Sequence, residues 1–191
     1  MDTTGFVKKQ TLYLAILAAL IVGFVGGVAF SVYKAPATGN PQVTGQQQEA
    51  KAMIAEMEKA TTQNPKDGNA WVQLGHAYFD TDQPEKAIAA YNKALELLPG
   101  DVNVMTDLGV MYHQNKQHQK AIELFDQVLK LKPEHEQARF NKGVVLLTGL
   151  NDRQAALAEW KILVKYHPMA AAPSGKMVGD LIEQMEKEPA K

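Results

Sequence analysis

Apolar residues recur with helical spacing along most of the chain, and the same pattern returns after about 34 residues. These positions lie three, four or seven residues apart, which places them on one face of a helix. Each period accommodates two such helices, so each unit is predicted to be a helical hairpin. The first copy has Trp71, Leu74, Gly75, Tyr78, Ala87, Tyr91, Ala94 and Pro99, and the second has Met105, Leu108, Gly109, Tyr112, Ala121, Phe125, Val128 and Pro133.

A third, less regular copy follows the first two. It runs one residue longer, and we place the additional residue in the turn around Leu150–Asp152. A single hairpin leaves one face uncovered, so stacked hairpins must bury a continuous core, with atypical helices closing both ends. The recognisable positions of the third copy are Gly143, Leu146, Ala156, Trp160, Leu163 and Pro168.

Candidate closing helices flank the three copies. Upstream, residues 46–66 have Met53, Met57 and Ala60 at helical spacing and end near Pro65, like the second half of a hairpin. Downstream, Ser174–Lys187 is predicted to be a helix with Ser174 as its N-cap. Its apolar positions are Met177, Leu181, Ile182 and Met185.

A different pattern precedes the repeats, because residues 11–33 contain no charged side chain. At about 1.5 Å per residue, the apolar run reaches roughly 33 Å, enough to span a hydrocarbon core as a transmembrane anchor. A cleaved signal peptide with a site near Ala29–Ser31 is the alternative, although its apolar region is usually shorter. Lys8 and Lys9 precede the segment and Lys34 follows it, which favours a cytoplasmic N-terminus and export of the remainder.

Small residues form a stripe along the predicted anchor. Ala19, Gly23 and Gly27 lie four residues apart and are a candidate helix-pairing face, with dimerisation through the anchor as one outcome. The alternative is that small residues are simply common in such segments. The predicted organisation is all-α: a tail (1–10), an anchor (11–33), a Pro/Gly linker (34–45), a lead-in helix (46–66), three repeats (67–101, 102–135 and 136–170) and a C-terminal capping helix with its tail (171–191).

Composition and charge exclude several classes of function. The net charge of −1 gives no basic face for nucleic acid. The absence of cysteine excludes disulfides, thiolate zinc sites and haem attached through a CxxCH motif. The five histidines lack metal-ligand spacing on one helix face, and the five-residue step between His113 and His118 is expected to point their rings apart. Asp80 and Asp82 bracket a predicted turn and are interpreted as structural.

No cofactor, metal site or catalytic group is therefore predicted, and the chain is not expected to be an enzyme. The repeat resembles the tetratricopeptide repeat (TPR), with Trp71, Leu74, Gly75 and Tyr78 matching its W-x-x-L-G-x-x-Y motif. The resemblance implies an α-solenoid whose concave face is lined by the first helix of each hairpin. The peptide-binding positions that it implies are Asn69, Val72, His76 and Phe79, then Asn103, Thr106, Val110 and His113, and finally Gln137, Phe140, Asn141, Val144 and Leu147.

The expected lining is apolar and largely uncharged, which is typical of a binding surface for proteins or peptides. The capping helix could instead cover the share contributed by the third repeat. TPR receptors for chaperone tails hold a terminal carboxylate with a cationic clamp, and the matching positions here carry no cation. We therefore expect an internal or apolar segment as the ligand. The clamp positions are Val72, His76, Asp107, Gln137 and Asn141.

The complete arrangement resembles the membrane-anchored periplasmic TPR subunits of cytochrome c maturation, of the CcmH/NrfG type. In that family a helix ending in Asn-Pro precedes the repeat motif, as Asn64 and Pro65 do here. The resemblance implies a bacterial inner-membrane protein whose periplasmic TPR domain binds apocytochrome or haem-lyase partners. A scaffold for another envelope assembly, such as a secretion, pilus or cell-wall complex, is the alternative.

Overall fold

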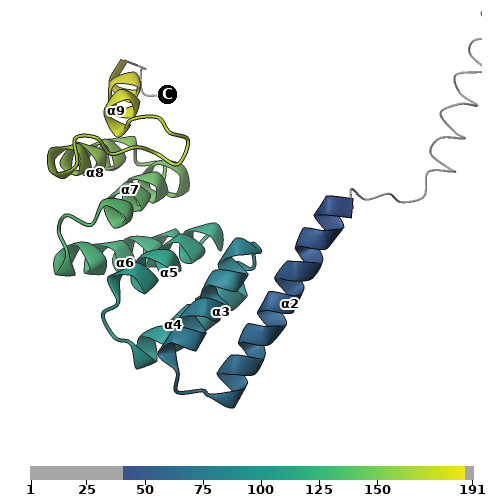
Figure 1. Cartoon of the computed structure of the whole chain (residues 1–191). Coiled ribbons are helices and arrows are strands. Elements are labelled where there is room, and N and C mark those ends of the chain that lie inside the picture. The colour runs from purple at the N-terminus through teal and green to yellow at the C-terminus, as the bar shows by residue number, and fades with distance from the viewer. Residues whose placement is uncertain (1–40, 188–191) are drawn as a thin grey trace, which may run out of the picture. The chain divides into compact units, whose positions relative to one another are not determined.

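The computed structural model describes residues 41–187, and this part of the chain is built from helices (Figure 1). One isolated bridge, between Ala171 and Met177, is the only β-structure among the described residues. From α4 onward each helix packs against the preceding one, as in an α-solenoid. The elements are α2 (Pro41–Gln63), α3 (Gly68–Asp80), α4 (Pro84–Leu97), α5 (Val102–Gln114), α6 (His118–Leu131), α7 (Glu136–Val144), the π-helical turn η1 (Val145–Gly149), α8 (Arg153–Tyr166) and α9 (Val178–Lys187).

The predicted membrane anchor, residues 11–33, lies outside the described residues, as do its pairing face at Ala19, Gly23 and Gly27 and the N-terminal tail. Within residues 41–187, no helix is long and apolar enough to cross a membrane.

The helices recur with the period of the sequence pattern. Both α3 and α4 return 34 residues later as α5 and α6, and α8 begins 35 residues after α6. The turn inside each hairpin has one left-handed residue, with φ of 54° at Asp82, 58° at Lys116 and 55° at Asn151. In the second hairpin, the Gln117 N–H donates to the Tyr112 carbonyl at 2.8 Å and closes the end of α5.

The first helix of each hairpin has a side-chain cap at its N-terminus. Asp67 accepts hydrogen bonds from the Asn69 and Ala70 N–H groups at 3.0 and 3.1 Å. Asp101 does the same for the second hairpin. In the third hairpin His135 replaces the aspartate, and its Nδ1 accepts from the Ala138 N–H at 3.2 Å.

The additional residue of the third repeat is not in the turn where the sequence analysis placed it. It is accommodated inside the first helix of that hairpin, where η1 (Val145–Gly149) forms a π-helical turn. The turn itself then keeps the geometry of the other two, with Asn151 in the left-handed position. A π turn adds one residue while leaving the helix continuous, so the expected insertion at Leu150–Asp152 was wrong.

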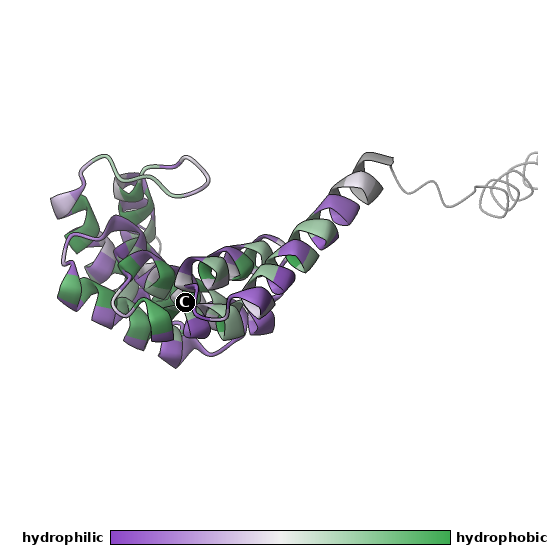
Figure 2. Ribbon diagram, turned by 60° about the horizontal axis from the view of Figure 1, so that its bottom comes forward, coloured by the Kyte–Doolittle hydropathy of each residue, from purple (hydrophilic) through white to green (hydrophobic). Residues whose placement is uncertain are grey.

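The core lies between the two helices of each hairpin and between neighbouring hairpins. Tyr91 and Phe125 are fully buried and Trp160 is 4% exposed, and each ring packs against a glycine of the facing helix. A Cβ atom on Gly109 would lie 2.6 Å from the Phe125 ring, so only glycine permits this approach. Figure 2 shows both hydrophobic and hydrophilic residues on the helices, as expected where one face of a helix is buried and the other is exposed.

The lead-in helix is longer than predicted toward the N-terminus. Because α2 begins at Pro41, residues 41–45 of the expected linker are helical. Ile54 and Met57 pack against the core of the first hairpin, and the Tyr78 hydroxyl donates to the Glu58 carboxylate. Met53, expected on the same face, is 47% exposed.

The C-terminal helix begins later than predicted, at Val178. Ser174 is therefore not its N-cap, because residues 171–177 form a tight reversal in which Gly175 has φ of 81°. A left-handed residue cannot continue a right-handed helix. The helical spacing of apolar residues therefore predicted a helix that began too early, inside this turn. Val178 and Ile182 of α9 pack on Trp160 and Leu163.

Candidate functional site

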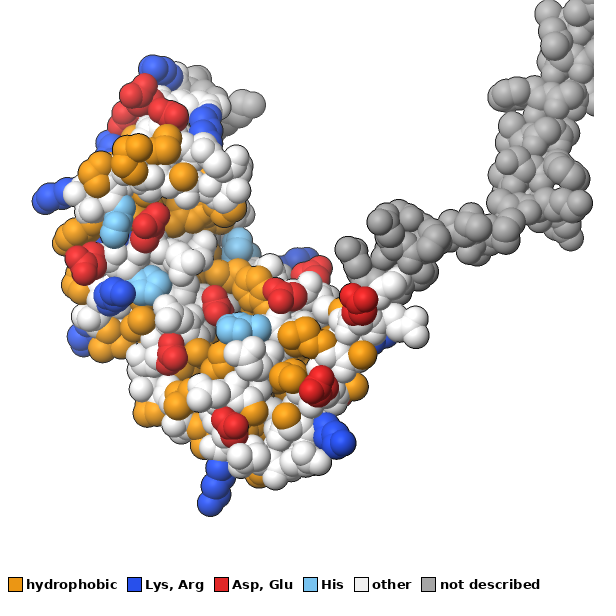
Figure 3. Space-filling model, in the orientation of Figure 1, with side chains coloured by type: hydrophobic (Ala, Val, Ile, Leu, Met, Phe, Trp, Pro, Cys, Tyr) orange, Lys and Arg blue, Asp and Glu red, His pale blue; other side chains and the backbone are white. Residues whose placement is uncertain are grey.

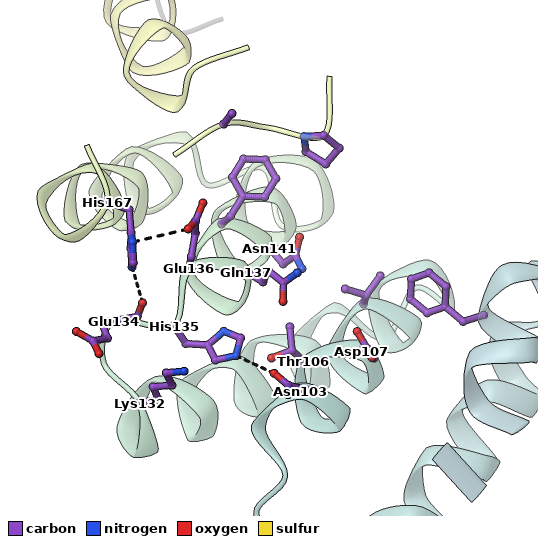
Figure 4. Close-up of a pocket in the computed structure, with 15 residues that line it drawn as sticks. Asn103, Thr106, Asp107, Lys132, Glu134, His135, Glu136, Gln137, Asn141 and His167 are labelled. Carbon is purple, nitrogen blue, oxygen red and sulfur yellow. Dashed lines mark hydrogen bonds and ion pairs between the residues drawn. The ribbon is translucent and has the colours of Figure 1, made fainter. Parts of the chain in front are cut away.

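A groove of about 850 Å³ opens on one side of the second and third hairpins (Figure 4). Its lining comes from the first helices α3, α5 and α7, from the connection between α6 and α7, and from the segment that follows α8. The residues are Phe79, Asn103, Thr106, Asp107, Val110, Lys132, Glu134, His135, Glu136, Gln137, Phe140, Asn141, His167, Ala171 and Pro173.

The structure brings seven of the thirteen predicted positions together in this groove. Asn103 and Gln137 occupy equivalent places in the first turns of α5 and α7, and both side chains are exposed. Thr106 lines the groove but is 2% exposed, and its hydroxyl donates to the Val102 carbonyl at 2.6 Å. The seven are Phe79, Asn103, Thr106, Val110, Gln137, Phe140 and Asn141.

The other predicted positions lie elsewhere. Asn69 is exposed on the first turn of α3, and Val72 packs against the core of the first hairpin. Val144 and Leu147 pack against the buried cluster that contains Trp160 and Leu163 of α8 and Val178 and Ile182 of α9.

Phe140 has a double role. It lines the groove, and its ring stacks on Trp160 with 5.8 Å between the ring centroids and 16° between the planes. The Trp160 Nε1–H also donates to the Phe140 carbonyl at 3.0 Å. Replacement of Phe140 by a charged residue would therefore disturb the fold as well as the groove.

The groove includes residues that the sequence analysis did not assign to it. Lys132, Glu134 and Glu136 come from the connection that leads into α7, and Ala171 and Pro173 come from the reversal before α9. Helical periodicity assigns faces only within helices, so it gave no signal for these segments. The equal length of the two connections between hairpins, residues 98–101 and 132–135, was the available hint to the place of the second connection.

Two histidines make contacts between the different segments that line the groove (Figure 4). The His167 Nε2 atom lies 2.7 Å from the Glu134 carbonyl, and its Nδ1 lies 3.7 Å from the Glu136 carboxylate. The His135 Nε2 atom lies 3.5 Å from Asn103 Oδ1. Burial, together with the charge of Lys132, lowers the pKa of His135, which favours the neutral ring that the cap on α7 requires.

A smaller pocket of about 300 Å³ adjoins the groove and shares two of its residues. Its lining residues are His76, Phe79, Asp80, Tyr91 and Asp107. His76 Nε2 lies 3.2 Å from Asp107 Oδ2, a contact between the first and second hairpins. Burial raises the pKa of Asp107, against the lowering effect of His76.

His113 is in neither pocket and contacts His118, so the expectation that these rings point apart was wrong. Their Nδ1 atoms lie 2.9 Å apart, and the Thr148 hydroxyl lies 3.3 Å from His113 Nε2. The expectation treated both residues as part of one helix. His113 instead lies in the last turn of α5 and His118 begins α6, and the left-handed turn at Lys116 brings the two rings together.

Charge on this side of the molecule is uneven. In Figure 3 acidic side chains and histidines are spread among apolar ones across the middle of the face shown, while lysine and arginine lie mostly toward its edge. Among residues 41–187, no group of three or more histidine, cysteine, aspartate or glutamate side chains is placed to hold a metal ion. The residues that line the groove offer hydrogen-bonding groups, apolar side chains and carboxylates.

Comparison with protein families identifies the repeats. Residues 66–134 match the family model of the tetratricopeptide repeat. The match covers the first two hairpins, and the third has the same helix–turn–helix geometry. This region is therefore a tetratricopeptide repeat solenoid, as its motifs predicted. No curated protein matches the sequence at a significant level.

Solved structures show the same fold. A crystal structure of MamA has a TM-score of 0.60 at 17% sequence identity, over 70% of this chain and 77% of that chain. Another structure of MamA protein has a TM-score of 0.58 at 24% identity, over 65% of this chain and 70% of that chain. The first TPR of Spaghetti (RPAP3) was solved with the HSP90 peptide SRMEEVD bound. It has a TM-score of 0.55 at 15% identity, over 63% of this chain and 90% of that chain. At these identities the similarity establishes the fold alone.

Proposed function

We propose that this chain is a non-enzymatic adaptor that holds an extended segment of a partner protein in the groove formed by its second and third hairpins. The groove itself carries the proposal, since its volume of about 850 Å³ lies within the range of ligand sites. Exposed amides at Asn103 and Gln137 offer both a donor and an acceptor to a peptide backbone. Phe79 and Val110 supply apolar contact beside them.

The proposed ligand is an internal segment rather than a chain terminus. The TPR of Spaghetti (RPAP3) was solved with the HSP90 peptide SRMEEVD, which is acidic. In this groove the carboxylates of Asp107, Glu134 and Glu136 outnumber the single lysine, Lys132. A terminal carboxylate would meet more like charge than opposite charge there.

We further propose that residues 11–33 anchor the protein in a bacterial inner membrane, with the TPR domain in the periplasm, where it assists cytochrome c maturation. The support is the resemblance of the lead-in, linker and repeat arrangement to the CcmH/NrfG-type subunits. Apocytochrome or haem-lyase subunits would then be the partners. The lead-in helix ending before Asn64 and Pro65 is the observation that favours this pathway over other envelope assemblies.

The first experiment is copurification of the full-length protein from its own cells in detergent, followed by mass spectrometry. Asn103→Arg with Gln137→Arg places two long side chains in the groove at exposed positions, so the fold should persist. Asn69→Arg is the matched control, because Asn69 has the equivalent position in α3 but does not line the groove. We expect partners to be lost from the double variant and retained by the control.

Partners that remain with both variants would contradict the groove as the binding site. Staining for covalently bound haem in a deletion strain tests the pathway separately. Loss of c-type cytochromes, restored by Asn69→Arg and not by the double variant, is the expected result. Normal cytochromes together with partners from a secretion, pilus or cell-wall complex would replace the maturation pathway with that assembly.

A further inference from the structure

The smaller pocket contains a polar group that the fold leaves without a partner. Tyr91 is fully buried, and among the described residues its hydroxyl has no hydrogen-bond partner. A buried hydroxyl without a hydrogen-bond partner destabilises the fold. The fold does not require this hydroxyl, because the equivalent position of the second hairpin is Phe125. A ligand group that satisfies it would explain its presence.

The charges around this hydroxyl indicate which kind of ligand group fits. Asp80 and Asp107 both line the pocket, and no lysine or arginine does. Among the described residues the Asp107 carboxylate is paired with His76, which offsets the negative charge only when its imidazole is protonated. A cation entering the pocket would meet two carboxylates and an oxygen that can accept a hydrogen bond.

An aromatic side chain favours the same kind of group. Phe79 is half-buried and lines the pocket from α3, and the face of an aromatic ring attracts a cation. The volume of about 300 Å³ is at the lower end of the range for ligand sites and suits one long side chain. Ammonium and guanidinium groups carry three and five N–H donors, enough to bond the hydroxyl and a carboxylate together.

We propose that this pocket receives an arginine or lysine side chain of the segment that lies in the adjoining groove. Phe79 and Asp107 line both cavities, so one extended chain can occupy the groove and insert a side chain here. The basic anchor meets Asp80, Asp107 and the Tyr91 hydroxyl. The inference rests on the proposed peptide-binding function and specifies the chemistry of its ligand.

The test is selection from a library of random 12-residue peptides displayed on phage, against the full-length protein in detergent. Asp80→Asn with Asp107→Asn removes the pocket's carboxylates. Asp82→Asn with Asp180→Asn is the matched control, since it makes the same two substitutions at exposed positions that line neither cavity. We expect wild type and control to enrich peptides with arginine or lysine at one fixed position, and the aspartate variant to lose that preference.

A motif without a basic position, or one that survives in the aspartate variant, overturns the inference and leaves the peptide groove intact. If the wild type enriches no peptide beyond the Asn103→Arg/Gln137→Arg variant, the peptide-binding proposal fails and this inference fails with it. The two failures are therefore distinguishable.

Tyr91→Phe is a second test that removes a single oxygen atom. Binding of a fluorescent selected peptide, measured by anisotropy, should weaken roughly tenfold, the effect of losing one hydrogen bond to a charged group. The melting temperature should stay equal or rise, because an unpaired buried hydroxyl disappears. Tyr112→Phe is the control, since Tyr112 lines neither cavity. Unchanged affinity in Tyr91→Phe would overturn the role of the hydroxyl.

Discussion

At the scale of single residues, the three hairpins differ most in how their first helices begin. Asp67 and Asp101 cap α3 and α5 with carboxylates, whereas α7 depends on His135. A carboxylate accepts hydrogen bonds at any pH above its pKa, but an imidazole accepts one only while one of its ring nitrogens carries no proton. Among the first helices of the three hairpins, α7 is thereby the one whose capping group is an imidazole, which loses its acceptor when it binds a second proton.

This difference predicts a pH dependence of stability. Burial lowers the pKa of His135 below its ordinary value of 6.5, so the unfolded chain binds the proton first as the pH falls. The stabilisation is present above pH 6.5 and is lost as the pH falls below it toward the folded-state pKa. His135→Asn keeps a capping side chain that does not titrate. We expect its free energy of unfolding at pH 7.5 to stay within about 1 kcal/mol of wild type.

Urea unfolding at pH 7.5 and pH 5.0 measures the effect. The wild type should lose more stability between these values than His135→Asn does. Burial also lowers the pKa of His113, so the variant should keep part of the dependence. Equal losses in both proteins would contradict the assignment of the titrating cap to His135.

At the scale of elements, sequence periodicity predicted the helical hairpins because the same side chains that carry the pattern form the core. Leu74, Leu108 and Trp160 are recognisable in the sequence and buried in the structure. The end of the capping helix nearest the repeats was misplaced, because Gly175 in a left-handed conformation interrupts residues that otherwise have helical spacing. Periodicity reports which face is buried and not where the backbone reverses.

The same limit applies to the groove. The positions on α5 and α7 were predictable from helix faces, whereas Lys132 and Pro173 belong to connections whose course depends on tertiary packing. His113 was assigned to the concave face by the resemblance to tetratricopeptide repeats, whereas in the structure its ring contacts His118. Contacts between helices joined by a tight turn follow from the turn, and the left-handed residue at Lys116 has no signature in the pattern.

The additional residue of the third hairpin gives a prediction at the element scale. Deletion of Thr148 removes one exposed residue from the π turn and restores ordinary α-helical spacing. Deletion of Asn151 instead removes the left-handed residue of the turn, which two other hairpins retain. We expect the first deletion to cost less stability, and the second to cost roughly 1–3 kcal/mol.

Thermal unfolding followed by circular dichroism compares the two deletions directly. A larger loss for Thr148 than for Asn151 would show that the π turn is itself required for packing between the second and third hairpins. The hydroxyl of Thr148 contacts His113 across that junction. Loss of this contact is the physical reason why deletion of Thr148 could cost the larger amount of stability.

At the scale of the whole molecule, the function proposed for the groove depends on whether the N-terminal segment tethers the groove to a membrane. Segment 11–33 contains no charged residue and is long enough to cross a membrane, whereas the repeats are of mixed polarity. A retained anchor would keep the groove within reach of membrane-bound partners and raise its effective concentration there. A cleaved signal peptide would release the same groove as a free domain, so the two alternatives give different behaviour for identical binding residues.

We predict that the full-length protein stays in the membrane fraction after carbonate extraction, with residues 11–33 still attached to the mature chain. Protease added to intact spheroplasts should digest the repeats, since two lysines before the segment and one after it favour an exported C-terminal part. Protection of the repeats in spheroplasts would reverse the orientation. A mature chain beginning near residue 31 would identify a cleaved signal peptide, and the adaptor would then have to reach its partners through the groove alone.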